Sequence, residues 1–309
     1  MKMLNKQVLY KLRSLIGLIG LAIVLTILTP RFLTLSNFTN ILRQTSLNAI
    51  MAVGMTFVIL TAGIDLSVGS IFAFAAAITA GMLAGGVNVY FAVAAGLVIG
   101  AFLGTVNGFL ITMGKVPPFI STLAMMTILR GATLVYTNGQ PITGLGDAFY
   151  YVGGGFIGIF PVPVIITFIV FGLGYYILSQ CKIGRYFYAL GGNEEAARLS
   201  GINTDYVKTI AYTISGLLAA LSGIIIASRL NSAQPTAGQG AELDAIAAVV
   251  LGGTSLSGGQ GGVIGTLIGA LIIGVLNNGL NLLNVTPFYQ LIAKGAVILI
   301  AILVDRKDN

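Results

Sequence analysis

The sequence predicts an all-α, polytopic membrane protein that forms one domain over residues 1–309, with about ten membrane-spanning helices. Hydrophobic residues make up 56% of the chain and charged residues only 8%. A soluble domain carries roughly 25% charged residues, so this chain has too little charge for a surface that faces water on all sides. Histidine is absent, and carboxylates are not clustered. We therefore expect no metal site and no integral-membrane enzyme.

The predicted spans are apolar segments near the length of roughly 20 residues that a membrane helix needs. They cover approximately 14–29, 47–64, 66–84, 89–113, 119–137, 164–179, 207–228, 245–256, 263–283 and 289–304. The first follows four basic residues and ends at Pro30, as a signal peptide would. No small-residue cleavage site follows it, so we expect an uncleaved first helix.

Two places could change the number of crossings. Gly-Ile-Asp-Leu-Ser at 63–67 allows only a tight turn between the second and third segments, and we expect Asp65 to cap the helix that follows. The eighth segment, 245–256, is short and ends in Gly-Gly-Thr-Ser. If either segment were re-entrant, the later segments would reverse and the C-terminus would lie outside. We predict ten crossings.

The basic residues give the orientation. With the N-terminus inside, the outer side receives only Arg31, Arg43 and Arg229, while Arg130 and Lys294 fall within spans. The cytosolic side receives Lys2, Lys6, Lys11, Arg13, Lys115, Lys182, Arg185, Arg198, Lys208, Arg306 and Lys307. This bias agrees with the positive-inside rule, so we expect both termini in the cytosol.

Short matches point to an inverted repeat. Val-Ile-Gly-Ala-Phe-Leu-Gly at 98–104 resembles Val-Ile-Gly-Thr-Leu-Ile-Gly at 263–269, and Arg130-Gly-Ala resembles Lys294-Gly-Ala. The matched spans are five apart, and an odd offset means opposite orientation. Chance similarity in a glycine-rich chain is the alternative.

Leu-Ser-Gly-Gly-Gln at 256–260 has the spelling of the signature peptide of ATP-binding-cassette (ABC) ATPases. Such an ATPase also needs the phosphate-binding Gly-x-x-x-x-Gly-Lys-Ser/Thr sequence, which this chain lacks. The pentapeptide also lies between two apolar segments. We interpret it as a glycine turn.

The longest polar stretch, 181–208, predicts a short cytosolic helix. Asn193 is placed to cap it, Glu194 and Glu195 lie in its first turn, and Gly201 is placed to end it. A helix of two turns needs outside support, because isolated helices shorter than roughly 12–15 residues are marginal. It either packs on this chain's own inner face or docks into a soluble partner.

This loop carries a family resemblance. Gly-Arg-Tyr-Phe-Tyr-Ala-Leu-Gly-Gly-Asn-Glu-Glu-Ala-Ala-Arg-Leu-Ser-Gly-Ile at 184–202 resembles the coupling region of permease subunits of bacterial monosaccharide ABC importers. The resemblance extends over nearly the whole chain and is greatest to ribose-type permeases. Its other supporting stretches are 48–56, 63–70, 232–238, 242–254 and 277–283.

The resemblance implies a permease domain of the bacterial inner membrane that works as two copies with a cytosolic ABC ATPase and an extracytoplasmic sugar-binding protein. ATP and Mg²⁺ would bind to the ATPase, so this chain would hold no cofactor, bind no nucleic acid and catalyse nothing. The sugar would be ribose or a related monosaccharide, although permeases for other sugars and autoinducer-2 share most of these features. The residues matching the coupling motif are Gly191, Gly192, Asn193, Glu194, Glu195, Ala196, Ala197 and Arg198.

Neutral amides and hydroxyls within the spans are candidates for the sugar pathway, because a sugar hydroxyl in hydrocarbon needs hydrogen-bond partners. Asn277 and Asn281 share one helix face. The alternative is that such groups bond neighbouring helices. The candidates are Asn48, Thr56, Asn107, Asn277, Asn278 and Asn281. We assign structural roles to Asp65, as a cap, and to Arg130, as a buried partner of carbonyl groups.

Two other functions compete with this interpretation. An ion-driven secondary transporter usually needs buried ionisable residues, and the spans offer only Asp65 and Asp244. A channel or structural membrane protein would not need the capped inner helix.

Overall fold

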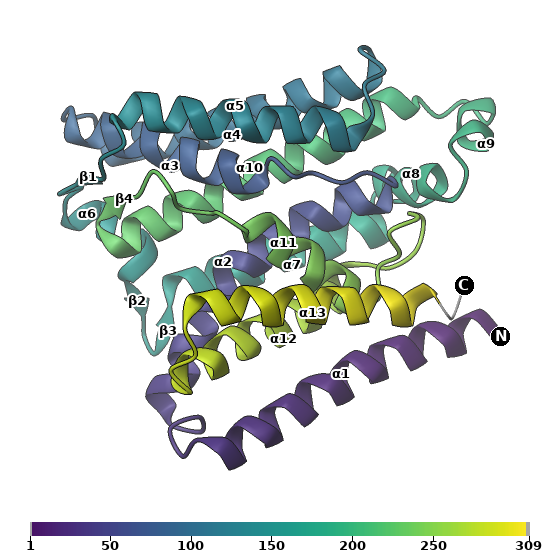
Figure 1. Cartoon of the computed structure of the whole chain (residues 1–309). Helices are drawn as coiled ribbons and strands as arrows, with labels where there is room; N and C mark the ends of the chain where they lie inside the picture. Colours follow the sequence, from purple (N-terminus) through teal and green to yellow (C-terminus); the bar gives the residue numbers. More distant parts are fainter. Residues whose placement is uncertain (1, 307–309) are drawn as a thin grey trace.

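The computed structural model describes residues 2–306, which are mainly helical (Figure 1). The helices are α1 (Lys2–Leu28), α2 (Leu35–Leu60), α3 (Val68–Ala84), α4 (Val89–Thr112), α5 (Pro118–Thr137), α6 (Asp147–Gly154), α7 (Val162–Gln180), α8 (Lys182–Gly192), α9 (Glu194–Leu199), α10 (Thr204–Leu230), α11 (Ala241–Leu251), α12 (Val263–Leu282) and α13 (Pro287–Arg306). Two-residue strands form the antiparallel pairs β1 (Ile142–Thr143) with β4 (Ser232–Ala233) and β2 (Phe156–Ile157) with β3 (Phe160–Pro161).

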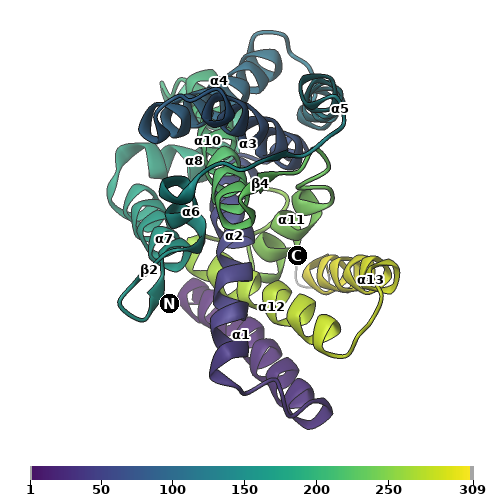
Figure 2. The same cartoon turned by 90° about the vertical axis from the view of Figure 1, so that its left-hand side faces the viewer.

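The long helices run roughly along one direction. Helices α2 and α10 lie between α4 and α5 on one side and α1, α12 and α13 on the other (Figures 1 and 2). The start of α1 and the end of α13 lie at the same end of the molecule as α8 and α9, whereas β1, β4 and α6 lie at the opposite end (Figure 1). One end of the bundle therefore carries the short polar helices.

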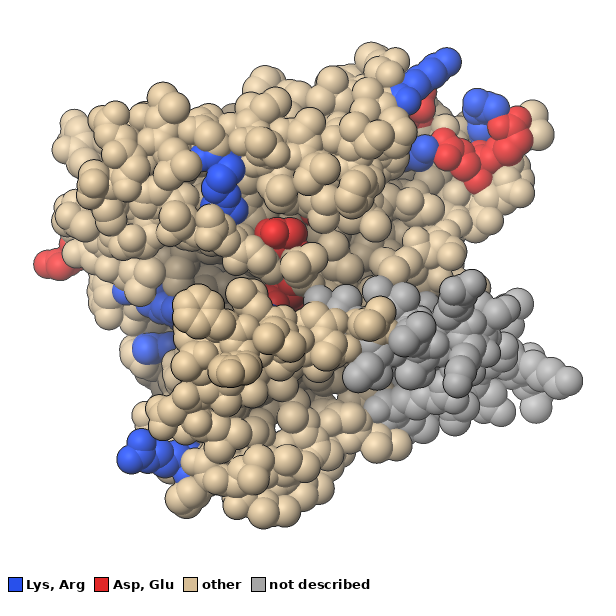
Figure 3. Space-filling model, viewed as in Figure 1, with Lys and Arg blue, Asp and Glu red and all other residues tan. Residues whose placement is uncertain are grey.

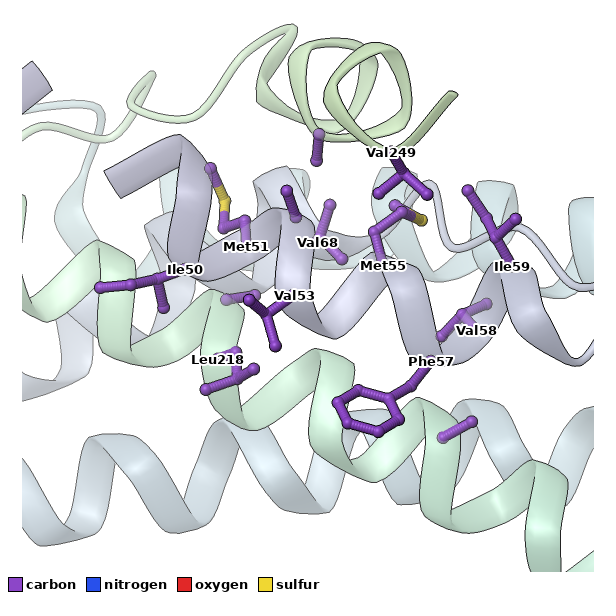
Figure 4. Close-up of a cluster of buried hydrophobic side chains, with 14 of the residues drawn as sticks. Ile50, Met51, Val53, Met55, Phe57, Val58, Ile59, Val68, Leu218 and Val249 are labelled. Atoms are coloured by element: carbon purple, nitrogen blue, oxygen red, sulfur yellow. The ribbon is translucent and has the colours of Figure 1, made fainter. Parts of the chain in front are cut away.

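The core is built around the second half of α2. Ile50, Phe57 and Ile59 are fully buried, and α10 and α11 contribute Leu218 and Val249 to the same cluster (Figure 4). A helix that is apolar on all sides must be covered on all sides. Helix α2 is therefore the central element.

Glycines bring the helix backbones close together. A Cβ added at Gly104 of α4 would collide with the carbonyl oxygen of Tyr212 in α10. A Cβ added at Gly269 of α12 would collide with the carbonyl oxygen of Ala248 in α11. Small residues at such crossings allow tight packing in lipid, so these glycines have a packing role.

Each predicted apolar segment lies on a helix, although several helix ends differ from the predicted ones. Helix α2 starts at Leu35, well before the predicted start at 47, because Thr34 caps it by accepting a hydrogen bond from the N–H of Asn37 at 3.3 Å. Helix α11 ends at Leu251, because a glycine-rich stretch follows. By length and composition, five of the described helices could cross a membrane, namely α4, α5, α7, α10 and α12.

The predicted capping role of Asp65 is wrong. Ser67 is the N-cap residue of α3, and Asp65 accepts the backbone N–H (3.0 Å) and hydroxyl (2.6 Å) of Ser67 through Oδ1. Its Oδ2 accepts the hydroxyl of Ser215 in α10 at 2.8 Å. The connection 61–67 is longer than the predicted turn, so Asp65 lies too early to reach the first-turn N–H groups of α3. It fastens this connection to α10 instead.

Candidate functional site

A polar cluster lies at the start of α11. Figure 3 shows acidic side chains in the middle of the face in view, where α11 lies in Figure 1. Asp244 of α11 is buried and forms an ion pair with Lys294 of α13 at 2.9 Å. The side chain of Asp244 is 9% exposed and that of Lys294 is 23% exposed. A buried charge is costly unless it is paired, so each group stabilises the other.

Two predicted pathway residues complete this cluster. The Nδ2 atoms of Asn48 in α2 and Asn277 in α12 approach Asp244 Oδ2 at 3.4 and 3.5 Å. Oδ1 of Asn277 is buried and has no hydrogen-bond partner among the described residues. An unpaired buried carbonyl oxygen is an acceptor for a hydroxyl donor. Four helices therefore bring together a carboxylate, an ammonium group and two amides.

The other predicted pathway residues lie elsewhere. Thr56 bonds to Thr266 of α12 at 2.8 Å, and Asn278 exchanges two hydrogen bonds with Asn37 of α2 at 2.8 and 3.0 Å. Asn107 is fully buried and donates to the Ser67 hydroxyl at 2.8 Å. These three side chains hold helices and connections together, as in the alternative that the sequence left open.

Asn281 is exposed and accepts from Gln290 Nε2 at 2.8 Å. It lies one turn from Asn277 on α12, as predicted, yet it does not reach Asp244. The four-residue spacing places both amides on one side of α12, but only Asn277 lies at the position along the helix where the cluster forms.

Arg130 belongs to a second charged group beside the cluster. Its Nη1 donates to the carbonyl oxygen of Ala237 at 2.8 Å, in the turns that precede α11. Its charge also attracts that of Glu242 at the start of α11. Arg130 therefore joins α5 to the segment that precedes α11.

The polar stretch 181–208 folds as α8 and α9. Asn193 is the N-cap of α9, and its side chain accepts from the N–H of Ala196 at 2.9 Å. Glu195 pairs with Arg198, and Glu194 pairs with Lys208 at 2.6 Å. Gly201 has φ +83°, a conformation that suits glycine after a helix end. The helix lies between the predicted cap, Asn193, and the predicted end, Gly201.

The two alanines of α9 differ in surroundings. Ala197 is buried against this chain, whereas Ala196 is exposed. Leu199 at the helix end is 80% exposed. One side of α9 therefore packs on the membrane domain, and the other side, with an exposed leucine, is free for a partner. Gly191 and Gly192 are the last two residues of α8, directly before the cap Asn193.

The sequence alone did not reveal the central role of Asp244 and Lys294. Lys294 could have indicated it, because a lysine within a span needs a counter-ion. Asp244 lies at the edge of the short eighth segment. Asn37 was missed because it precedes the predicted start of the second span.

Comparisons with known proteins found relatives that are similar in sequence over nearly the whole chain. The ribose import permease protein of Escherichia coli (strain K12) is 56% identical over 310 aligned positions, which cover 99% of this chain and 96% of the relative. That of Bacillus subtilis (strain 168) is 57% identical, covering 98% and 94%. The D-allose transport system permease protein of Escherichia coli (strain K12) is 41% identical, covering 93% and 89%. No solved structure matches the chain significantly.

A family model described as the permease component of branched-chain amino acid transport systems matches residues 37–302. This match includes the polar cluster and both short helices of the 181–208 stretch. Together with the full-length similarity to the ribose and allose permease proteins, it shows that the chain belongs to this permease family.

Proposed function

We propose that the chain is the membrane-spanning permease subunit of a bacterial ABC importer for ribose or a related monosaccharide. The observation that carries this proposal is the similarity to ribose import permeases over nearly the whole length of both chains. The short capped helix α9, with one exposed side, is the element through which such a subunit would receive the motion of an ATPase. The protein is then a multi-pass component of the inner membrane.

The assembly would contain two copies of this chain, a cytosolic ABC ATPase and an extracytoplasmic sugar-binding protein. ATP and Mg²⁺ would bind to the ATPase, and this chain would catalyse no hydrolysis. The 181–208 stretch would be the coupling loop, with residues 191–198 at the ATPase. Support comes from the exposed side of α9, which includes the ion-paired Glu195 and Arg198.

Ten crossings, with both termini in the cytosol, would complete the topology of this subunit. Helix α11 has 11 residues and is about 16 Å long, roughly half of the hydrocarbon core. The segment of turns before it, residues 234–240, would make up the remainder. That segment starts at β4, beside β1, and the chain after α11 reaches the C-terminus of α2. The eighth segment would thus cross fully despite its short helix.

An inverted repeat would relate the first five spans to the last five. Two features support it. The short helices α3 and α11 each follow a long helix and a non-helical segment, and the glycine-lined helices α4 and α12 occupy corresponding places in the order of spans.

The polar cluster would lie along the sugar path. Asn48 and Asn277 offer amides that pair with sugar hydroxyls, and the open Oδ1 of Asn277 is an acceptor. Neutral amides bind sugars weakly enough to release them. The Asp244–Lys294 pair would hold α11, α12 and α13 in register around these amides.

The proposal predicts ATP-dependent uptake of ribose by the reconstituted complex in vesicles. Uptake should exceed that of other sugars in a panel containing allose, xylose, galactose and arabinose. It should stop when ATP is removed and continue when a proton ionophore collapses the pH gradient. Uptake that follows the proton gradient instead would favour an ion-driven transporter and overturn the proposal.

The orientation predicts one-sided labelling of introduced cysteines. In a Cys181→Ser background, a cysteine at Arg198 should react with a membrane-impermeant maleimide only after the cytosolic side is opened. A cysteine at Ala148, at the opposite end of the molecule, should react in intact cells whose outer membrane has been permeabilised. Labelling of the Arg198 variant from outside would reverse the proposed topology.

A further inference from the structure

Three separate parts of the chain meet backbone to backbone beside the coupling helices. They are the C-terminal end of α2 at Leu60–Ala62, the glycines Gly191 and Gly192 at the end of α8, and the connection 252–262 between α11 and α12. We call this connection the glycine loop. It contains the Leu-Ser-Gly-Gly-Gln sequence at 256–260, which forms turns in this chain. The N–H of Gly259 donates to the carbonyl oxygen of Leu60 at 3.0 Å.

Gly191 lies at the centre of this junction. A Cβ at this position would collide with the Leu60 carbonyl oxygen and the Gly259 nitrogen, and it would lie 3.0 Å from the Gly258 carbonyl carbon. A backbone carbonyl and a backbone N–H give way little, because their helices and turns hold them. Gly192, the next residue, has nothing within 4 Å of its added Cβ. The close contact is therefore specific to Gly191.

The glycine loop is shaped to fit this contact. Gly258 and Gly259 have φ +85° and +69°, values that a residue with a side chain rarely adopts. A hydrogen bond from the Tyr188 hydroxyl of α8 to the Gly261 carbonyl oxygen, at 3.0 Å, adds a second attachment. Burial raises the pKa of Tyr188 above its ordinary value, so this hydroxyl keeps its proton at neutral pH and donates.

The junction connects two regions of functional interest. On one side, α8 leads directly into α9, and α8 is anchored on α2 by an edge-to-face contact of Phe187 with Phe57, with ring centroids 5.3 Å apart. On the other side, the glycine loop joins α11 to α12, which carry Asp244 and Asn277. A displacement of α8 would therefore act on the glycine loop, and through it on the two helices that carry the polar cluster.

We propose that the contact of Gly191 with Leu60 and the glycine loop is the relay that transmits movement of α8 and α9 to α11 and α12. The inference rests on the proposed coupling of this chain to an ATPase. Gly191, Gly258 and Gly259 act as positioning residues, through their contacts with backbone atoms. Their lack of side chains keeps the three backbones in direct contact, so no flexible side chain absorbs the movement.

The test compares Gly191→Ala with the matched control Gly172→Ala in the reconstituted complex with its ATPase and binding protein. Gly172 lies in α7, outside the coupling loop, and a Cβ added there also has nothing within 4 Å. The first readout is the number of sugar molecules transported per ATP hydrolysed. The second is a fluorophore on a cysteine at Ser257, an exposed residue of the glycine loop, in a Cys181→Ser background. Its emission should change when ATP is added to the wild-type complex.

Gly191→Ala should assemble with the ATPase but transport at least about fivefold less sugar per ATP, the lower end of typical coupling between distant sites. The Ser257 label should lose its response to ATP. Gly172→Ala should behave as wild type in both readouts. If Gly191→Ala fails to assemble, Tyr188→Phe decides, because it removes only the hydroxyl bonded to the loop and should lower the same ratio.

An unchanged ratio with an unchanged label response in Gly191→Ala, or in Tyr188→Phe when it decides, overturns the relay. The label also separates this inference from the choice of sugar. If wild type takes up no tested sugar while its label responds to ATP, and Gly191→Ala loses that response, the relay stands and the substrate assignment falls. A response kept in Gly191→Ala overturns the relay whatever the uptake.

Discussion

Lys294→Met is expected to destabilise the folded permease by about 3–5 kcal/mol, the usual cost of removing one partner from a buried ion pair. Asp244 would be left with a buried negative charge and only two long amide contacts, at 3.4 and 3.5 Å. The measurement is the midpoint of thermal unfolding in detergent, followed by size-exclusion chromatography. Asp244→Asn should have a similar effect, because it leaves the ammonium group of Lys294 unpaired.

The double variant Asp244→Asn/Lys294→Met should regain most of the lost stability, because it buries no unpaired charge. Lys115→Met is the matched control, since Lys115 is exposed and forms no ion pair with another of the described residues. A double variant no more stable than the single ones would contradict the pairing. Asn277→Leu in the otherwise unchanged chain should keep stability and lower uptake about fivefold, as expected for one lost hydrogen bond of roughly 1 kcal/mol.

Ala196→Trp should disconnect the permease from its ATPase. Ala196 is exposed on α9, so the large side chain is tolerated by the permease itself but obstructs the surface proposed for docking. A loss of about 2 kcal/mol at such a position weakens binding roughly 30-fold. Affinity purification of the complex measures the ATPase retained, and uptake should fall with it.

Two comparisons make this result specific. Ala148→Trp places the same side chain on exposed α6 at the opposite end of the molecule and should retain the ATPase. Ala197→Trp should instead lower the stability of the permease, because Ala197 is 4% exposed and packs against its own chain. Full retention of the ATPase by Ala196→Trp would exclude α9 as the docking helix.

The sequence predicted local features well. Asn193, Gly201 and the length of α9 follow from capping rules that act over a few residues, and the apolar segments follow from hydropathy. Helix ends outside the apolar segments, such as the first turns of α2, carry no hydropathy signal. For that reason Asn37 and its pairing with Asn278 were missed.

Hydrogen bonds between side chains far apart in the sequence could not be predicted from such local rules. The sequence marked Asn48 and Asn277 as candidates, but it also marked Thr56 and Asn278, which the structure uses to join α2 to α12. Only the tertiary arrangement distinguishes an amide that bonds a neighbouring helix from one that faces Asp244. Likewise, Asp65 lay near a helix start, and the length of the intervening connection decided that it bonds Ser215 instead.

The spacing of Asp244 and Lys294 along the chain has a consequence for synthesis in the cell. The two residues are 50 positions apart, and a ribosome adds about 5–20 residues per second. Asp244 is therefore synthesised about 2.5–10 seconds before its counter-ion exists. During that interval the nascent chain carries an uncompensated carboxylate, which must stay in the insertion machinery, in contact with water, or protonated. The carboxylate of Asp244 is neutralised when the last helix, α13, brings in Lys294. The fold is therefore completed only at the end of translation. Chains released early retain an exposed charge, which is a feature that membrane quality control can recognise.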